Sequence, residues 1–263
     1  MQLCEIVCTT PWNTSDASVS HAKAVAGLFA ARYVSRRERS IHRLFQDESC
    51  RVLIVAEKLP KLYHRLQPDK PLFFHPSMAA QRIQRMQRGE PDRLIRAAGV
   101  TAGDVVVDAT LGLGTDSLVF ASAVGENGHV IGLESISELY RLFLSAKRFG
   151  AAVYTEVKEL LARIHPVFCH HLAWLNAQAD NSVDVIYFDP MFQIPSLDSP
   201  AIQPLRQFAD PHTVSEESWE QACRVARKCV VLKERPESEL FKRFHIPPDK
   251  RRGRIAYGVW RKR

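Results

Sequence analysis

Residues 105–116 read VVVDATLGLGTD, and this stretch decides the fold of the chain. A run of valines stops at Asp108, passes through Gly112 and Gly114, and enters a helix-like segment at 116–124. A strand, a tight glycine turn and a helix N-terminus form a nucleotide-sized pocket at the carboxyl edge of a parallel sheet. The stretch therefore predicts a nucleotide-binding α/β fold.

Two further strand-like segments follow the glycine turn. Residues 129–134 end in Glu134, 20 positions after Gly114, where such a fold places the carboxylate that accepts hydrogen bonds from ribose hydroxyls. Residues 183–189 end in Asp189. Strands and helices alternate throughout this region, which predicts a parallel sheet with helices on both faces. The expected segments are 104–109, 116–124, 129–134, 136–148, 156–164, 167–169, 183–189, 216–227, 229–234, 237–244 and a last strand at 254–260.

The residues of the turn indicate which nucleotide it binds. A nicotinamide dinucleotide needs a third small residue three positions after the second glycine and room for its pyrophosphate at the helix N-terminus. Ser117 holds that position, but Asp116 puts a carboxylate where the pyrophosphate would approach. A carboxylate suits a ligand with a cationic reactive end, so S-adenosylmethionine (SAM) is favoured over a dinucleotide. The residues expected to line it are Asp108, Gly112, Gly114, Thr115, Asp116, Glu134 and Ser135.

Two segments resemble a known family. DATLGLGTD at 108–116 and YFDPMF at 187–192 are similar to class I methyltransferases, and more narrowly to the bacterial small-subunit ribosomal RNA guanine-N2 methyltransferases (RsmJ-like). The fifth strand of that family ends in a Lys-x-Pro-like sequence, for which this chain has VVLKERP at 230–236. The likeness covers roughly residues 100–240. It implies a Rossmann-like, mostly parallel sheet whose reversed last strand is 254–260.

The segment after the fourth strand also resembles the Asp/Asn-Pro-Pro-Tyr/Phe motif of enzymes that methylate exocyclic amines of bases. Such an amine is a poor nucleophile because its lone pair is delocalised into the ring. Hydrogen bonds to the Asp189 carboxylate and the Pro190 carbonyl would direct that lone pair at the SAM methyl group, while Phe192 stacks on the base. We expect these three residues to be catalytic and Asp189 to border the cofactor as well. The alternative is that Asp-Pro only ends a strand.

Two other residues are candidates by position. His171 follows the expected third strand, where related enzymes contact the adenine of the cofactor, although a surface pair with His170 is an alternative. Lys233 ends the fifth strand and could contact a substrate phosphate or act as a base. As a base it would make the protein a ribose 2′-O-methyltransferase. No group of His, Cys, Asp or Glu has metal-ligand spacing, so we expect no metal.

Charge is unevenly distributed along the chain, whose net charge is +7. Residues 1–100 contain 16 Lys/Arg and 9 Asp/Glu, residues 101–240 contain 11 and 19, and residues 241–263 contain 9 and 1. An acidic cofactor region between two basic ends indicates a polyanion held by the ends, so we expect a nucleic acid. The resemblance implies that this nucleic acid is RNA, most simply ribosomal RNA or the small ribosomal subunit. The basic residues expected to contact it are Arg36, Arg37, Arg82, Arg85 and Lys233, with a solvated helix face as the alternative for Arg82 and Arg85.

The expected organisation is an N-terminal α+β appendage at 1–76, able to bind RNA, followed by a methyltransferase domain at 77–263.

There is no signal-peptide pattern and no apolar run of about 20 residues, and the six cysteines lack CxxC spacing. We therefore expect a cytoplasmic protein with reduced thiols; its oligomeric state stays open. The expected N-terminal segments are strands 3–10, 52–57, 61–65 and 71–75, a helix at 20–33 capped by Ser18 or Ser20, a short helix near Arg43, and a helix at 78–88 capped by Ser77.

Taken together, the sequence predicts SAM-dependent methyl transfer to an exocyclic amine of a base in RNA, guanine N2 first and adenine second. A ribose 2′-O, small-molecule or protein methyltransferase is the alternative enzyme. A non-catalytic RNA-binding assembly factor with the same fold is the alternative of another class. Asp108, Glu134 and Asp189 argue against that last reading, because an inactive site has no physical need for three carboxylates facing one cleft.

Overall fold

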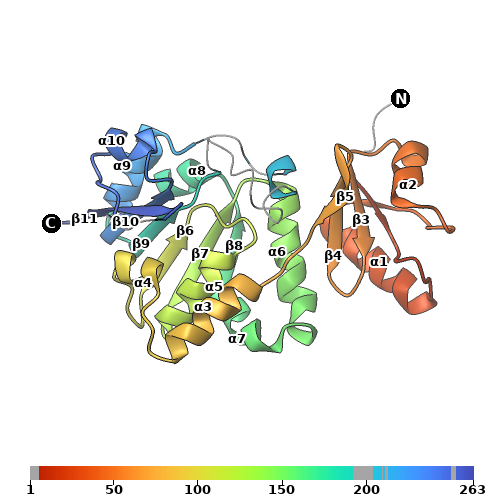
Figure 1. Cartoon of the computed structure of the whole chain (residues 1–263), viewed down its shortest axis with the longest axis horizontal. Helices are drawn as coiled ribbons and strands as arrows, with labels where there is room; N and C mark the ends of the chain where they lie inside the picture. The colour runs from red at the N-terminus through yellow and green to blue at the C-terminus, as the bar shows by residue number, and fades with distance from the viewer. Residues whose placement is uncertain (1–5, 192–203, 209, 211–212, 250–252) are drawn as a thin grey trace. The chain divides into compact units, whose positions relative to one another are not determined.

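The computed structural model describes residues 6–191, 204–208, 210, 213–249 and 253–263. The chain forms two compact units, each with its own sheet (Figure 1). The N-terminal unit contains residues 1–75, 141–155 and 196–209, and the C-terminal unit contains 76–140, 156–195 and 210–263.

The sheet of the C-terminal unit has the strand order β11-β10-β9-β6-β7-β8. All neighbouring strands pair in parallel except β11, which runs antiparallel to β10. The strand order changes direction between β6 and β9, and ligands of such sheets bind outside the carboxyl ends of the strands at this point. These observations confirm the expected fold class, including its reversed last strand. The strands are β6 (Val105–Asp108), β7 (His129–Glu134), β8 (Ile164–Phe168), β9 (Val183–Phe188), β10 (Ala226–Glu234) and β11 (Ala256–Arg261).

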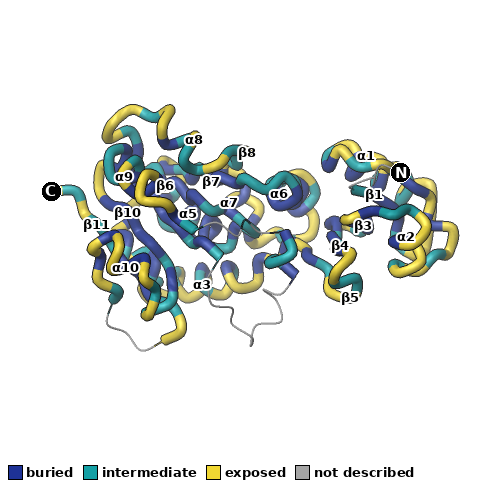
Figure 2. Tube along the Cα trace, turned by 90° about the horizontal axis from the view of Figure 1, so that it is seen from above, coloured by how far each residue is buried: buried dark blue, intermediate teal, exposed yellow. Residues whose placement is uncertain are grey.

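Helices cover this sheet, and its strands are correspondingly buried (Figure 2). All six residues of β9 are buried, which explains why its sequence is a nearly continuous apolar run and does not alternate. The helices of this unit are α3 (Ser77–Gln87), α4 (Arg93–Ala98), α5 (Thr115–Val124), α7 (Lys158–Arg163), α8 (His171–Asn176), α9 (Glu216–Val225) and α10 (Glu239–Arg243). Helix α6 (Ser137–Phe149) begins in this unit, and its residues from 141 onward belong to the N-terminal unit.

The N-terminal unit has a second, mixed sheet with the order β2-β1-β3-β4-β5. β1 pairs in parallel with β2 and β3, whereas β3, β4 and β5 are antiparallel neighbours. Val7, Leu44 and Leu53 are fully buried in its core. The elements are β1 (Ile6–Thr9), α1 (Asp16–Phe29), β2 (Arg32–Tyr33), α2 (Ile41–Glu48), β3 (Val52–Ala56), β4 (Pro60–His64) and β5 (Gln67–Leu72).

Several expected boundaries were wrong. Helix α1 begins at Asp16, because Ser15 and Ser18 form a capping box in which Ser18 is the third helical residue and not the cap. The helix ends before Ala30, which adopts a left-handed conformation. Ser77 does not cap α3, since it is the first helical residue and follows Pro76, which has no side-chain cap bond.

Two helices and the first residues of one strand were not predicted from the sequence. α4 and α8 have six residues each, too short for a recognisable helical period. Strand β5 begins at Gln67, not at residue 71, although its first residues are polar, and its register with β4 is irregular. Polar strand residues at a sheet edge leave no alternating apolar pattern to read.

Candidate functional site

The glycine turn lies between β6 and α5, at the carboxyl end of the sheet. Gly112 and Gly114 have φ angles of 51° and 72°, in the left-handed region that residues with a Cβ rarely adopt. Gly114 is the N-cap of α5 and gives it no side-chain cap. No side chain of the N-cap residue therefore covers the first amides of α5, and Thr115 is the first, partly exposed residue of the helix.

Strand β7 fixes the position of the turn. The amide N of Leu111 donates to the carbonyl of Leu133 at 2.9 Å. The buried side chain of Leu111 occupies the space over Gly132, where an added Cβ would lie 2.7 Å from Leu111 Cδ1. Gly132 is thus required for the close packing of the turn against β7.

Glu134, at the end of β7, holds the same turn with its carboxylate. Oε2 accepts from the Gly112 amide at 2.9 Å and Oε1 from the Ile136 amide at 2.8 Å. Burial raises the pKa of this carboxyl group, against the effect of its backbone donors. The Ser135 amide is a third backbone donor to this carboxylate. A carboxylate offers about four acceptor positions, so capacity remains for a ribose hydroxyl. The next residue, Ser135, donates to Asp210 at 3.3 Å.

Asp108, the last residue of β6, contacts the turn with its side chain and is 2% exposed. It accepts from Ser117 Oγ at 2.6 Å and from the Thr110 amide at 3.2 Å. Burial raises the pKa of Asp108 to about 7, and the nearby charge of Asp116 adds to the effect. Ser117 therefore links the first turn of α5 to the end of β6.

Asp116 has a different environment from the one expected for a carboxylate facing a cationic ligand. It is 7% exposed and accepts from Arg82 Nη1 at 2.5 Å, Tyr187 Oη at 2.7 Å and Lys233 Nζ at 2.8 Å. Burial alone would raise its pKa, but Lys233 and Arg82 outweigh burial and hold the pKa well below its usual range. Two cations already meet its charge, so the argument that Asp116 selects a sulfonium was wrong.

Arg82 also departs from its expected role at the substrate. In addition to Asp116, it donates to both carboxylate oxygens of Asp92 at 2.9 Å. Asp92 is in turn the N-cap of α4. Arg82 thus joins α3, α4 and α5, and its guanidinium is engaged by protein carboxylates and is not presented to a phosphate.

Asp189 lies directly after β9, next to the glycine turn. Its amide donates to Thr110 Oγ1 at 2.7 Å, and its Oδ2 accepts from Lys233 Nζ at 2.7 Å. Burial raises the pKa of Asp189, and the Lys233 charge opposes the rise only in part. Its side chain remains 27% exposed, so part of the carboxylate faces solvent. Pro190 behind it is buried.

Lys233 lies between the two carboxylates, with an ion pair to Asp116 at 2.8 Å and to Asp189 at 2.7 Å. Burial lowers the pKa of the ammonium group, but Asp116 and Asp189 outweigh burial and raise the pKa above its usual value. Lys233 is therefore a permanent cation that orients Asp189. We name Arg82, Asp116, Tyr187, Lys233 and Asp189 the charge network.

Two aromatic contacts lie at the carboxyl ends of β9 and β8, the strands on either side of β6 and β7. His171, the first residue of α8, meets Phe188 edge to face at 5.4 Å, and burial together with His170 lowers its pKa to about 4. Its imidazole is therefore neutral at pH 7. Phe168 ends β8 in register with Glu134 and is 53% exposed, with Tyr140 at 5.4 Å. The sequence reading missed Phe168, because its meaning depends on the strand register.

The remaining predicted residues belong to the N-terminal unit, to the surface of α3 or to a part of the chain outside the described residues. Arg36 is buried in the N-terminal unit, and Arg37 is exposed there. Arg85 is exposed on α3 and pairs with Glu90 at 3.0 Å, as a solvated helix face would. Phe192 lies outside the described residues. Among the described residues no group of three His, Cys, Asp or Glu could hold a metal ion.

Comparisons with known proteins agree with this geometry. The sequence pattern of the SAM-dependent methyltransferase family matches residues 39–247. The chain belongs to this family. It is therefore a SAM-dependent methyltransferase with SAM as its cofactor, and the open glycine turn and the spare acceptors of Glu134 fit that nucleotide. Within the described part of the chain, no helix has the length and apolar character needed to cross a membrane.

Individual relatives differ in how much of the methyltransferase they match. The Bacillus subtilis protein YpiP is 35% identical over 95% of this chain and 97% of its own length. Ribosomal RNA small subunit methyltransferase J is 31% identical in Psychrobacter arcticus and 32% in Pasteurella multocida, but the matches cover 46% and 61% of those enzymes. The SAM-dependent methyltransferase NGO1261 from Neisseria gonorrhoeae has the same fold, with a TM-score of 0.62, 22% identity, and coverage of 97% of this chain and 95% of that one.

Proposed function

We propose that this methyltransferase transfers the methyl group of SAM to an exocyclic amine of a base in RNA, guanine N2 of small-subunit ribosomal RNA in the first place. The observation that carries the proposal is the Asp189 carboxylate. It follows β9 beside the glycine turn, and Lys233 and Thr110 restrain it from two sides.

Asp189 is suited to accept a hydrogen bond from an amine. Oδ2 is engaged by Lys233, and within the described residues no partner is found for Oδ1. Lys233 keeps a positive charge beside the carboxylate and so favours the ionised, acceptor form over the neutral acid. An ionised carboxylate accepts a stronger hydrogen bond than a neutral carbonyl does. The amine is thereby fixed at the edge of the cofactor turn.

The reaction then requires position more than basicity. SAM supplies an electrophilic methyl group on a sulfonium. The amine lone pair forms the new N–C bond while the C–S bond breaks and its electron pair stays on sulfur. The nitrogen loses its proton only as it becomes cationic, to Asp189 or to water. Holding the amine in line accounts for most of the rate in such a step.

The ribose 2′-O alternative depends on Lys233 as a base. A lysine base needs a pKa lowered toward neutrality, whereas two carboxylates raise the pKa of Lys233. Lys233 is also held in place, because its side chain is 15% exposed and forms ion pairs with Asp116 and Asp189. The charge network therefore favours the amine over the hydroxyl.

The RNA part of the proposal rests on charge and on partial relatives. The basic ends of the chain fit a polyanion, and two relatives are named as ribosomal RNA small subunit methyltransferases, although they match only about half of this chain. A site suited to a base amine fits a nucleic acid, and the partial relatives favour RNA over DNA.

The test is to incubate the protein with methyl-labelled SAM and, separately, unmodified ribosomal RNA, small subunits, transfer RNA and DNA. The labelled nucleoside is then identified by mass spectrometry. We expect N2-methylguanosine from ribosomal RNA or the small subunit. A ribose-methylated nucleoside would contradict the amine assignment, and label in none of the nucleic acids would contradict the RNA assignment.

A further inference from the structure

An exposed tryptophan stands on a fixed loop of the N-terminal unit. Trp12 is 57% exposed and follows β1 on the segment that leads into α1. Two contacts fix this segment: Thr10 and Thr14 share a hydroxyl hydrogen bond of 3.0 Å, and Arg36 Nη1 donates to the Thr10 carbonyl at 3.2 Å. The indole is thus presented to solvent from an ordered base, unlike a side chain on a free loop.

Arg36 lies beneath this indole and has an unusual charge balance. Its guanidinium is 5.5 Å from the centre of the Trp12 ring, and the residue is 7% exposed. Its two hydrogen bonds go to backbone carbonyls, those of Thr10 and Arg39, and it forms no ion pair with a carboxylate in the described part of the chain. Burial lowers the pKa of Arg36, and the charge of Glu57, which forms no ion pair with the guanidinium, opposes the fall only in part. A buried cation is costly, and a nearby anion would offset more of that cost.

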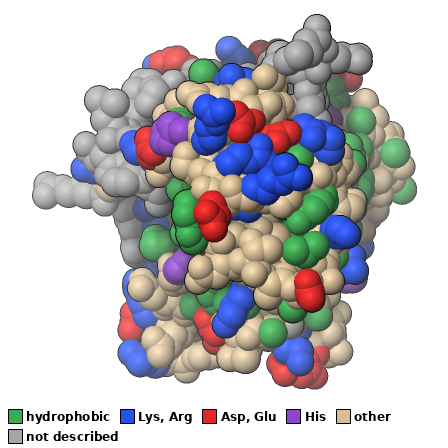
Figure 3. Space-filling view, turned by 90° about the vertical axis from the view of Figure 1, so that its right-hand side faces the viewer, with side chains coloured by type: hydrophobic (Ala, Val, Ile, Leu, Met, Phe, Trp, Pro, Cys, Tyr) green, Lys and Arg blue, Asp and Glu red, His purple; other side chains and the backbone are tan. Residues whose placement is uncertain are grey.

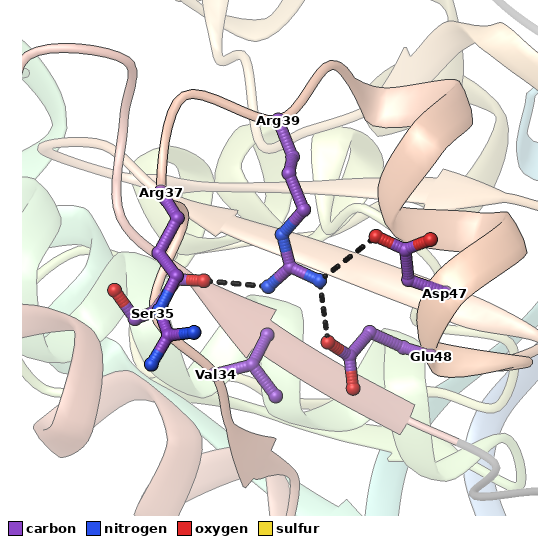
Figure 4. A pocket seen from close by; sticks show the side chains of 6 residues that line it. All are labelled: Val34, Ser35, Arg37, Arg39, Asp47 and Glu48. Atoms are coloured by element: carbon purple, nitrogen blue, oxygen red, sulfur yellow. Dashed lines mark hydrogen bonds and ion pairs between the residues drawn. The ribbon is translucent and has the colours of Figure 1, made fainter.

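Arg37, the next residue, adds a second unpaired cation. It is exposed, and no carboxylate pairs with it among the described residues. It lines a hollow of about 450 Å³ whose other arginine, Arg39, is bonded to Asp47 and Glu48 (Figure 4). In that view Arg37 has no contact to either carboxylate. The carboxylates of the hollow are therefore already satisfied, and the charge of Arg37 remains available.

The N-terminal unit also carries a net positive charge beyond these two arginines. Figure 3, which faces the N-terminal unit, shows Lys and Arg side chains gathered on one part of it, with fewer Asp and Glu beside them. Residues 1–76 contain 11 Lys/Arg and 7 Asp/Glu. An aromatic platform beside unpaired cations is the arrangement by which proteins hold single-stranded nucleic acid: a base stacks on the ring and the cations attract the adjoining phosphate.

We propose that Trp12, Arg36 and Arg37 form a binding site for single-stranded RNA in the N-terminal unit, separate from the methyl-transfer site. The proposal rests on the proposed RNA substrate and names the part of the chain that grips it. Trp12 stacks on one base, Arg37 contacts the neighbouring phosphate, and Arg36 supplies the buried charge beneath the ring. Stacking tolerates any base, so the site adds affinity and no sequence choice.

The test measures binding of a fluorescent single-stranded RNA of about 12 nucleotides to the full chain, without SAM, so that no turnover occurs. Trp12→Ala is expected to weaken binding about tenfold, whereas Trp12→Phe, which keeps an aromatic ring, stays within about threefold of the wild type. Leu66→Ala is the matched control, because Leu66 is a large apolar side chain that is 75% exposed in the same unit. It is expected to leave binding unchanged.

A second pair of variants tests the charge. Arg37→Ala is expected to weaken binding and to make it less dependent on salt, because one phosphate contact is lost. Arg43→Ala removes the same charge from an arginine that is already paired with Asp47 at 2.9 Å, and is expected to have the smaller effect. Thermal unfolding of each variant checks that the fold is intact.

Several results would overturn the proposal: no RNA binding by the wild type, equal binding by Trp12→Ala and Leu66→Ala, or Trp12-dependent capture of a ribosomal protein without Trp12-dependent RNA binding. The outcome is separable from that of the proposed function. Trp12-dependent binding without methylated nucleoside would support this site and contradict the reaction. Methylation of RNA with binding that does not depend on Trp12 would support the reaction and contradict this site.

Discussion

Buried arginines and lysines are used in opposite ways in the two units. In the C-terminal unit Arg82 and Lys233 meet Asp92, Asp116 and Asp189, so that the cations of the charge network are paired. In the N-terminal unit Arg36 is buried with only backbone carbonyls as partners.

The difference separates two tasks. A closed set of ion pairs fixes side-chain geometry, which a methyl transfer in line requires. Arg36 holds the Trp12 segment through backbone carbonyls, forms no ion pair with a carboxylate in the described part of the chain, and is therefore suited to a ligand that brings an anion. The four predictions that follow test the closed set and its surroundings, from the largest expected effect to the smallest.

Asp189→Ala removes the acceptor from the charge network. We expect methyl transfer to fall by about 10²–10⁴-fold, because the amine is no longer aligned, while the affinity for SAM stays within a few fold. Single-turnover transfer and calorimetric SAM binding measure the two quantities. Asp189→Asn, which keeps an acceptor oxygen, is the control and should retain more activity. Full activity of the alanine variant would contradict the role of Asp189.

Lys233→Met leaves Asp116 and Asp189 without the cation between them. We expect the free energy of unfolding to fall by about 1–3 kcal/mol, the cost of acceptors that lose a donor, because Asp116 keeps its ion pair with Arg82 and Asp189 is 27% exposed. Urea denaturation measures it. Lys228→Met is the matched control on the same strand, since Lys228 is 41% exposed and its pair with Asp104 is worth no more than about 1 kcal/mol. Equal losses in the two variants would show that the network is not a stabilising unit.

Asp108 gives a pH-dependent test beside the network. Its pKa is raised from 3.8 to about 7 in the folded chain, so the folded state keeps a proton that the unfolded state has lost between these values. Stability should therefore fall as pH rises from about 4 to about 7, by at most about 1.4 kcal/mol per pH unit, and level off above 7. Asp108→Asn should lack this slope. Urea titrations at several pH values compare the two; parallel curves would exclude the raised pKa.

Glycine substitutions give the smallest effects, with opposite signs in the two units. Gly114→Ala forces a side chain into a φ of 72° and should cost about 1–2 kcal/mol and weaken SAM binding. Gly27→Ala lies inside α1 with open space around it and should stabilise by about 0.5–1 kcal/mol. Melting temperatures measure both. A neutral Gly114→Ala would mean that the turn does not need its left-handed residue.

Local sequence was sufficient for the sheet of the C-terminal unit. Valine runs such as 105–107 and the glycines after them act over a few residues, and all six strands were expected, although β8 begins at Ile164 and not at residue 167. The first and last residues of the strands were less predictable. Strand β10 begins at Ala226 and not at 229, because its first residues pair with β9 across an irregular register.

The partners of the site carboxylates could not be read from the sequence. Arg82, Tyr187 and Lys233 are 34, 71 and 117 residues away from Asp116, and only the folded sheet brings them together. The sequence identified Asp116 as important, but it could not show that its charge is already met. The same applies to Arg36, whose burial depends on contacts with Thr10 and Trp12.

The most direct test replaces single groups on the target nucleotide, once the labelled position in RNA is known. Two short RNAs are compared with the unmodified one: inosine at the target removes only the exocyclic amine, and 2′-deoxyguanosine removes only the ribose hydroxyl. Transfer of labelled methyl groups to each is measured under single-turnover conditions. The account predicts no transfer to inosine RNA and retained transfer to the deoxy RNA. Transfer to inosine RNA, with loss on the deoxy RNA, would contradict it.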